Sequence, residues 1–160
     1  MKTIIAGCRN YNDILALRKR LDYYIEHNGP ITEVVSGGAS GVDTMGEAYA
    51  LLNNIPIKGF PADWNKHGKK AGPIRNRQMA QYADVLFAVW DGKSKGTKNM
   101  IDEMNKLKKP VFIMWIGDPI IANAAAGEDN HAGDGGYQIG SREKYEEFNR
   151  KRNYKIPGTE

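Results

Sequence analysis

Residues 31–52, ITEVVSGGASGVDTMGEAYALL, contain three kinds of local pattern in succession. An apolar run at 31–35 predicts a buried strand, Ile31–Ser36. Residues 44–52 have the composition of a helix, and we expect that helix to cover Gly41–Asn53. Between the two, residues 36–43 place three glycines within five positions. Glycines at a strand-to-helix junction indicate a backbone that closely approaches another group.

The same alternation continues on both sides of this stretch. Apolar runs predict strands at 3–7, 31–36, 55–60, 84–90 and 110–116, and helical spacing predicts helices at 13–28, 41–53, 71–82 and 97–108. Strands that alternate with helices through short loops form parallel sheets. We therefore predict an α/β fold: a doubly wound, mainly parallel sheet of five or more strands with helices on both faces.

The unusual loops all follow predicted strands. They cover Gly7–Asp13, Ser36–Asp43, Pro61–Gly72 and Asp91–Thr97. In open parallel sheets, ligands bind beyond the carboxyl ends of the strands. The four loops are therefore expected to meet at one edge and to form a site there.

The glycine loop at 36–43 suits an anionic ligand. A helix N-terminus offers backbone N–H groups and partial positive charge, and glycines let a phosphate reach them. The loop lacks both the Gly-Lys-Ser/Thr ending of a Walker A motif and the GxGxxG spacing of NAD-binding proteins. It could also be a tight turn with Ser40 as N-cap and Asp43 completing a capping box. Because Asp43 would repel a phosphate, a ribose hydroxyl is its expected partner.

The loop at 91–97 also combines a glycine with the start of a helix. Gly96 permits close approach, and Thr97 can cap the next helix. Together with the loop at 36–43, this segment predicts a site for a phosphate and a sugar.

Composition limits the other possibilities. The 160 residues suit one domain, and no run approaches the about 20 apolar residues of a membrane span. The early strand pattern argues against a signal peptide, and a single cysteine excludes an internal disulfide. The three histidines are scattered, so we expect no metal, and we expect a cytoplasmic protein. Net charge is +4, with six basic residues against one acidic residue in 58–77, which is either a solvated loop or an anion-attracting rim.

Several motifs, in order, resemble a known family. They are GCR (7–9), SGGASGVD (36–43), PADW (61–64), GKKAGPIRNRQM (68–79), Asp84 and GKSKGT (92–97). This pattern, over residues 1–116, resembles the YspA-type branch of the SLOG superfamily (DUF2493 domain), which is related to LOG phosphoribohydrolases and to the DNA-binding DprA. The resemblance implies a Rossmann-like fold, a nucleotide or nucleotide-derived ligand without a further cofactor, and a homo-oligomer.

The resemblance also bears on catalysis. LOG enzymes use an Arg from an Arg-Lys-x-x-Met stretch and a Glu from a Gly-Thr-x-x-Glu stretch. Arg75 matches the former, but Met100 occupies the position of the carboxylate. A thioether cannot accept a proton, and Glu103 lies about 4.5 Å further along the helix axis. The sequence therefore favours binding over LOG-type hydrolysis.

Two alternatives remain. The protein could be a nucleotide N-glycosidase or phosphoribohydrolase with Arg75 and a carboxylate from Asp43 or Asp63. It could also bind single-stranded nucleic acid as DprA does, which requires stacking aromatics along a groove. Trp64 is the candidate stacking residue of the basic stretch, and one such ring does not line a groove, so nucleic acid is the least favoured ligand.

The expected ligand-binding residues come from the loops and the helix at 71–82. They are Gly7, Arg9, Ser36, Gly37, Gly38, Ala39, Ser40, Gly41, Asp43, Asp63, Trp64, Arg75, Gly92, Ser94, Gly96 and Thr97. Some of these have a simpler interpretation: Arg75 as a surface charge of its helix, Trp64 as a plug over the sheet edge, and Arg9 as the partner of a carboxylate.

The domain boundaries follow the loss of periodicity after residue 116. We expect a SLOG-like domain at 1–116 and a flexible Gly/Ala-rich loop at 117–140. Residues 141–160 are expected to form a C-terminal helix and tail that pack on the same domain, with Tyr145 and Phe148 on the apolar face.

Overall fold

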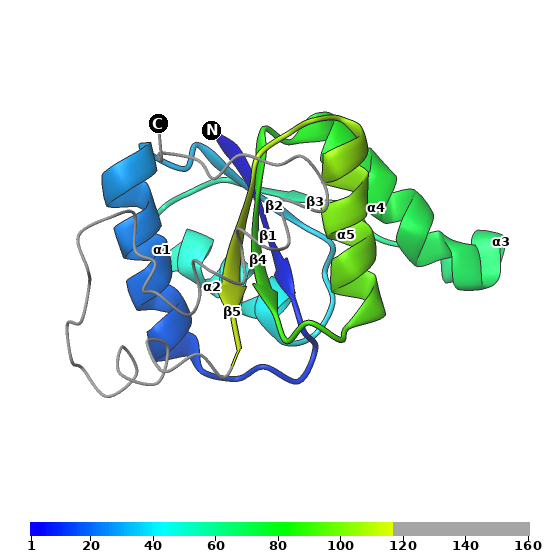
Figure 1. Cartoon of the computed structure of the whole chain (residues 1–160), viewed down its shortest axis with the longest axis horizontal. Coiled ribbons are helices and arrows are strands. Elements are labelled where there is room, and N and C mark those ends of the chain that lie inside the picture. Colours follow the sequence, from blue (N-terminus) through cyan, green and yellow to red (C-terminus); the bar gives the residue numbers. More distant parts are fainter. Residues whose placement is uncertain (117–160) are drawn as a thin grey trace.

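The computed structural model describes residues 1–116, which form one parallel sheet between two pairs of long helices (Figure 1). The strands are β1 (Lys2–Gly7), β2 (Glu33–Ser36), β3 (Ile57–Gly59), β4 (Val85–Trp90) and β5 (Val111–Trp115). The helices are α1 (Ile14–Asn28), α2 (Val42–Leu52), α3 (Trp64–His67), α4 (Ala71–Tyr82) and α5 (Lys95–Lys106), with a 3-10 turn, η1, at Gly68–Lys70. The strand order is β3-β2-β1-β4-β5, and every pair is parallel.

One face of the sheet packs against α1 and α2. Ile5, Phe87 and Phe112 are register partners on β1, β4 and β5 and form a row across this face. Tyr24 of α1 packs edge-on against both phenylalanine rings, at centroid distances of 5.6 and 5.1 Å. Gly46 of α2 lies directly over Ile5. All six residues of β4 are buried, as expected for a strand covered on both faces.

The opposite face packs against α4 and α5, which lie side by side (Figure 1). Met79, Met100 and Ile101 are buried there. Lys109 precedes β5 and donates from Nζ to the carbonyl oxygens of Ala80, Gln81 and Ala83 at 2.7–3.0 Å. A cation at the last carbonyls of a helix is stabilising, so Lys109 fixes the end of α4 against the sheet.

The predicted fold class is confirmed, because the sheet has five parallel strands and helices on both faces. Some boundaries differ from the prediction. The loop at 61–72 contains α3 and η1, and β3 spans only Ile57–Gly59. Helix α5 begins at Lys95 because Ser94, and not Thr97, is its N-cap. The predicted segments at 117–140 and 141–160 lie outside the described residues.

No helix within residues 1–116 combines the length and the apolar character that crossing a bilayer requires.

Gly46 gives a direct test of the packing of α2 on β1. A Cβ at this position would lie 2.8 Å from Cγ2 of Ile5, whereas one at Gly96 in α5 would meet no atom within 4 Å. Overpacking costs about 1–3 kcal/mol, and alanine gains about 1 kcal/mol of helix propensity over glycine. We expect urea denaturation to show Gly46→Ala as destabilising and Gly96→Ala as neutral or stabilising. Equal effects of the two substitutions would contradict this packing.

Candidate functional site

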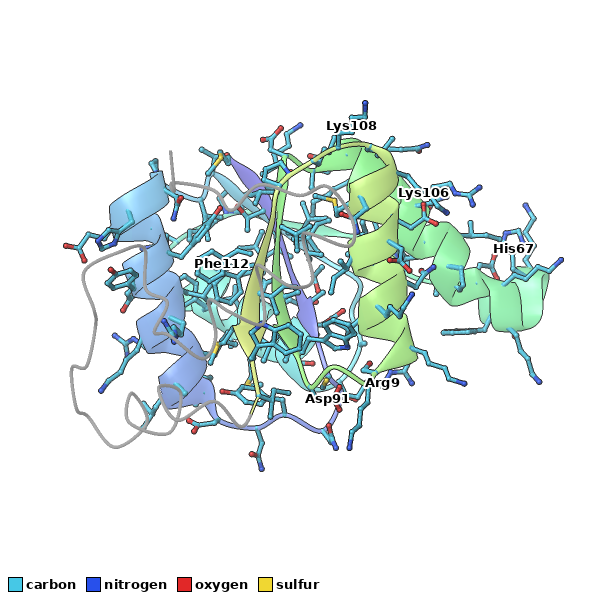
Figure 2. All side chains as sticks on the ribbon, viewed as in Figure 1. Arg9, His67, Asp91, Lys106, Lys108 and Phe112 are labelled. Atoms are coloured by element: carbon cyan, nitrogen blue, oxygen red, sulfur yellow. The ribbon has the colours of Figure 1, made fainter. Side chains whose placement is uncertain are left out.

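Two hollows open at the edge of the sheet where β1, β2 and β4 end, the edge at which Arg9 and Asp91 lie (Figure 2). The first, which we call the Asp91 hollow, has a volume of about 280 Å³. It is lined by Ala6, Gly7, Cys8, Arg9, Asn10, Ala39, Asp43, Arg75, Asn76, Met79, Asp91, Ser94, Gly96, Thr97 and Met100. Loops after β1, β2 and β4 thus meet here, as the sequence predicts.

The second hollow, which we call the Trp64 hollow, lies between the glycine loop and the segment after β3. Its volume is about 510 Å³. It is lined by Arg9, Ser36, Gly37, Gly38, Ala39, Ser40, Glu47, Gly59, Phe60, Pro61, Ala62, Trp64 and Arg75. Arg9, Ala39 and Arg75 line both hollows, so these three residues form a boundary that the two spaces share.

Side chains of β2 and α2 fix the glycine loop. The fully buried hydroxyl of Ser36 donates to Oε1 of Glu47 at 2.6 Å and accepts from the backbone N–H of Gly38 at 3.1 Å. Thr44 donates from Oγ1 to the carbonyl oxygen of Ala39 at 2.9 Å. The loop therefore has a defined conformation before any ligand arrives, which lowers the entropic cost of binding.

Helix α2 begins at Val42, one residue later than an N-cap at Ser40 would place its start. Its N-cap is Gly41, with φ at +74° and no side-chain capping bond. A Cβ at Gly41 would lie 2.4 Å from the carbonyl oxygen of Arg9 and 2.5 Å from that of Cys8. The close approach of the loop after β1 therefore requires glycine here, and the predicted capping box is wrong.

The side chain of Arg75 reaches from α4 to the glycine loop. Its Nη1 donates to the carbonyl oxygen of Gly37, and its Nε donates to Oδ1 of Asn76 at 3.1 Å. A Cβ at Gly37 would lie 2.5 Å from Nη1 of Arg75, so glycine is needed to admit the guanidinium. Burial lowers the pKa of Arg75 and nearby Arg9 lowers it further, while Asp43 opposes both effects. Two cations close together in a hollow favour an anion between them.

Asp43 lies at the base of the glycine loop with 6% of its surface exposed. Its Oδ2 accepts from the backbone N–H of Ala39 at 3.3 Å. Burial raises the pKa of Asp43 to about 6, although the bond from Ala39 and the charge of Arg75 both act to lower it. Keeping Asp43 ionised within the site therefore costs free energy. Ionisable groups with strongly perturbed pKa values are more common at functional positions than elsewhere.

Asp91 begins the loop after β4. Its Oδ1 accepts from the backbone N–H groups of Lys93 and Ser94, both at 2.8 Å, and these bonds are the main reason why its pKa is lowered. The Oγ of Ser94 in turn accepts from Thr97 N at the start of α5. Asp91 is therefore a fixed, ionised acceptor on the wall of its hollow.

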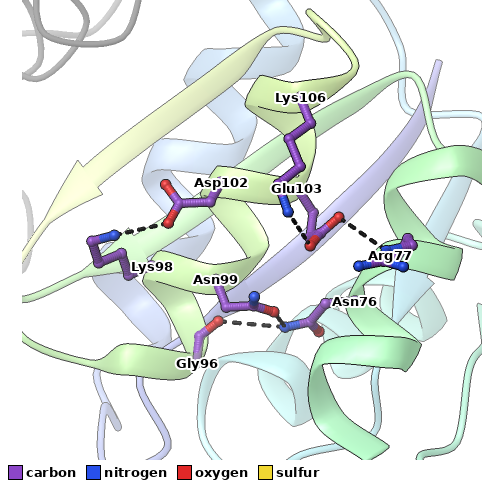
Figure 3. A network of polar contacts seen from close by, with 8 residues as sticks. All are labelled: Asn76, Arg77, Gly96, Lys98, Asn99, Asp102, Glu103 and Lys106. Atoms are coloured by element: carbon purple, nitrogen blue, oxygen red, sulfur yellow. Dashed lines mark hydrogen bonds and ion pairs between the residues drawn. The ribbon is translucent and has the colours of Figure 1, made fainter. Parts of the chain in front are cut away.

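Asn76 connects α4 to the start of α5 (Figure 3). Its Nδ2 donates to Oδ1 of Asn99 at 2.9 Å and to the carbonyl oxygen of Gly96 at 3.5 Å. Since its Oδ1 accepts from Arg75, Asn76 links the arginine to the first turn of α5, which carries Gly96. The two sides of the Asp91 hollow are thereby held together.

Met100 and Glu103 occupy different places relative to the hollow. Met100 lines the Asp91 hollow and is 2% exposed. The carboxylate of Glu103 pairs with Arg77 at 3.6 Å and with Lys106 at 3.0 Å (Figure 3), and Glu103 lines neither hollow. Met100 therefore lines the hollow, whereas Glu103 lies outside it with its carboxylate paired.

Most of the residues predicted from the sequence line one hollow or both. They are Gly7, Arg9, Ser36, Gly37, Gly38, Ala39, Ser40, Asp43, Trp64, Arg75, Ser94, Gly96 and Thr97. Gly41, Asp63 and Gly92 line neither hollow. Asp63 is the N-cap of α3 and accepts from Lys66 N at 3.0 Å. Gly92 has φ at +82° and supports the turn after Asp91.

Sequence reasoning missed three polar residues of the Asp91 hollow, which are Asn10, Asn76 and Asp91. Asp91 directly follows an apolar strand and begins the loop at 91–97, which the sequence already predicts to be part of the site, so its position was a usable signal. Asn76 had no such signal, because its importance depends on the contact between α4 and α5. Within residues 1–116, no cluster of three His, Cys, Asp or Glu side chains offers a metal site.

The fold is shared with solved structures of a DNA-binding protein. DNA processing protein A from Streptococcus pneumoniae matches with a TM-score of 0.57 and 17% identity, over 79% of this chain and 54% of that one. This chain thus spans about half of the pneumococcal protein. The Helicobacter pylori protein, described with its single-stranded DNA binding mode, matches with a TM-score of 0.56 and 18% identity, over 95% and 81%.

Two sequence comparisons give the family. The model of the YspA, cpYpsA-related SLOG family matches residues 1–67, which run from β1 through α3. The Gene 61 protein of Mycobacterium phage D29 is 33% identical over 117 residues, which are 69% of this chain and 94% of that protein. The family model covers the glycine loop and the phage relative covers more than two thirds of the chain, so the chain belongs to the YspA-related SLOG family.

Proposed function

We propose that the protein binds a nucleotide or a nucleotide-derived ribose-phosphate ligand at the carboxyl edge of its sheet, without LOG-type hydrolysis. The observation that carries this proposal is the position of Arg9 and Arg75, which line both hollows beside a preformed glycine loop. The family and the fold support nucleotide or nucleic-acid binding in general.

The phosphate is assigned to the junction of the hollows. The first turn of α2 follows the glycine loop and the first turn of α5 follows Ser94, and both helix N-termini carry partial positive charge. Arg9 and Arg75 add two full charges at the same place. Charge-assisted hydrogen bonds from arginine to phosphate are among the strongest that a protein can offer.

The arrangement of carboxylates supports binding over hydrolysis. Glu103 is paired with Arg77 and Lys106, and Asp63 caps α3, so neither lines the hollows. Asp43 does line a hollow, but it is nearly buried and accepts from Ala39. Of the two carboxylates that the sequence offers to the hydrolytic alternative, Asp43 alone lines a hollow, and its burial leaves it in a poor position to act on a substrate. Asp91 and Glu47 also line the hollows, but their carboxylates already accept from the N–H groups of Lys93 and Ser94 and from the hydroxyl of Ser36.

Single-stranded DNA is the second candidate ligand. Trp64 is 52% exposed at the rim of its hollow, and the exposed Lys66, Lys69 and Lys70 follow it on α3 and η1. Aromatic and basic side chains together are the usual components of single-strand binding sites. This surface, however, has one exposed aromatic ring where a groove would need several.

Thermal denaturation with AMP, ADP and a dT oligonucleotide tests the proposal. A ligand at 100 times its dissociation constant should add about 2.7 kcal/mol to the free energy of unfolding. We expect AMP or ADP to raise Tm, and chromatography of the same mixtures to show no free adenine. Release of adenine would support the hydrolase, and stabilisation by the oligonucleotide alone, steeply dependent on salt, would support DNA binding.

A further inference from the structure

We propose that the ligand is two-armed: a nucleoside diphosphate whose second phosphate carries a further sugar, with its base in the Trp64 hollow, its diphosphate at Arg9 and Arg75, and its distal sugar in the Asp91 hollow. This inference rests on the proposed function and deepens it. It would assign one class of ligand to both hollows together.

The first argument for this ligand is the position of the two arginines that would bind its phosphates. Arg9 and Arg75 line both hollows, so they lie on the boundary that the two spaces share and not at the far end of either. A mononucleotide has its phosphate at one end, and with that phosphate on the arginines it would fill only one hollow. A ligand with phosphates in its middle would place an organic group on each side.

The Trp64 hollow is suited to a base. Phe60, Pro61, Ala62 and Trp64 contribute apolar and aromatic surface to its wall. Aromatic side chains stack with any nucleobase, since every base has a π-face. Glu47 also lines this hollow, but its carboxylate already accepts from Ser36.

The Asp91 hollow is suited to a sugar and would repel a terminal phosphate. Asp91 and Asp43 both line it, and Ser94 and Thr97 add hydroxyl groups. Carboxylates accept hydrogen bonds from sugar hydroxyls, whereas two carboxylates beside a phosphate repel it. Asp91 is held in place by the N–H groups of Lys93 and Ser94, so its carboxylate can accept a hydrogen bond from a sugar hydroxyl without rearrangement.

Isothermal titration with ADP-ribose, ADP, AMP and ribose 5-phosphate tests this assignment on the full chain. ADP carries more negative charge than ADP-ribose, so charge alone would make ADP the tighter ligand. We expect ADP-ribose to bind about tenfold or more tightly than ADP, because hydrogen bonds to a charged acceptor are added in the second arm. This comparison uses the unmodified protein and does not depend on the folding of a variant.

Variants then test which residue contacts the distal sugar and which contacts the base. Asp91→Asn keeps an oxygen for the turn at 91–94 but loses the charge, and we expect it to reduce the ratio of ADP-ribose to ADP affinity to about threefold or less. Trp64→Ala should weaken both ligands by a similar factor, about fivefold or more. Asp102→Asn on α5, whose residue lines neither hollow, is the matched control and should preserve the wild-type ratio.

The outcomes separate this inference from the proposed function. If ADP or AMP binds at least as tightly as ADP-ribose, the two-armed ligand is excluded while nucleotide binding stands. If Asp91→Asn weakens ADP and ADP-ribose by the same factor, Asp91 does not contact a distal sugar, and the assignment of that arm is overturned. If none of the four compounds binds to the folded protein, both the inference and the proposed function fail.

Discussion

Replacement of Arg75 by alanine is expected to weaken ADP binding by about 50-fold or more. The variant loses a charge-assisted contact to the phosphate, and such contacts contribute about 1.5–3 kcal/mol each. It also loses the hydrogen bond from Nη1 to the carbonyl oxygen of Gly37, which holds the glycine loop against α4. Isothermal titration at low salt measures the effect, with Tm recorded to confirm that the variant folds.

Arg77 provides the matched control on the same helix. Its side chain is 63% exposed, it pairs with Glu103, and it lines neither hollow. Arg77→Ala removes the same net charge, so we expect a change in ADP affinity of less than about twofold. Equal losses for the two variants would mean that general electrostatic attraction, and not a site at Arg75, drives binding.

Replacement of Asp43 by asparagine is expected to stabilise the protein by about 2–3 kcal/mol at pH 7.5. Burial raises the pKa of Asp43 from 3.8 to about 6, so the folded state binds a proton more tightly than the unfolded state. Stability is therefore greatest below the unfolded pKa and falls as pH rises toward 6, by about 1.4 kcal/mol per unit of pKa shift. Asparagine keeps an oxygen acceptor for Ala39 and carries no charge to desolvate.

The pH dependence distinguishes this cause from a general packing effect. Urea denaturation of both proteins at pH 4 and pH 7.5 should show a large difference in the free energy of unfolding at pH 7.5. At pH 4 the native carboxyl group is protonated and the difference should nearly disappear. Destabilisation at pH 7.5 would show that attraction to Arg75 outweighs the cost of burying Asp43.

The fold was largely predictable because the relevant signals are local. Continuous apolar runs such as Val85–Trp90 indicated strands covered on both faces, and glycine loops followed them at regular intervals. A parallel arrangement then places every loop that follows a strand at the same edge. For that reason most site residues could be named without any knowledge of how the helices pack.

The predictions that were wrong or incomplete concern contacts between segments that are distant in the sequence. Gly41 replaces Ser40 as the N-cap because the carbonyl groups of Cys8 and Arg9 leave no room for a side chain. The bond from Arg75 to Gly37 joins residues 38 positions apart. No periodicity or local motif encodes such pairs, and the same reason explains why Asn76 was missed as the link to α5.

The position of β1 in the sheet also bears on how the chain folds during synthesis. This strand is made before both of its neighbours in the sheet, since it pairs on one side with β2 (Lys2 opposite Glu33) and on the other with β4 (Thr3 opposite Val85). The second pairing spans more than 80 residues of chain, and such non-local contacts slow folding. Until β4 leaves the ribosome, β1 has one unpaired edge, and residues 1–67 alone would expose that edge to other chains.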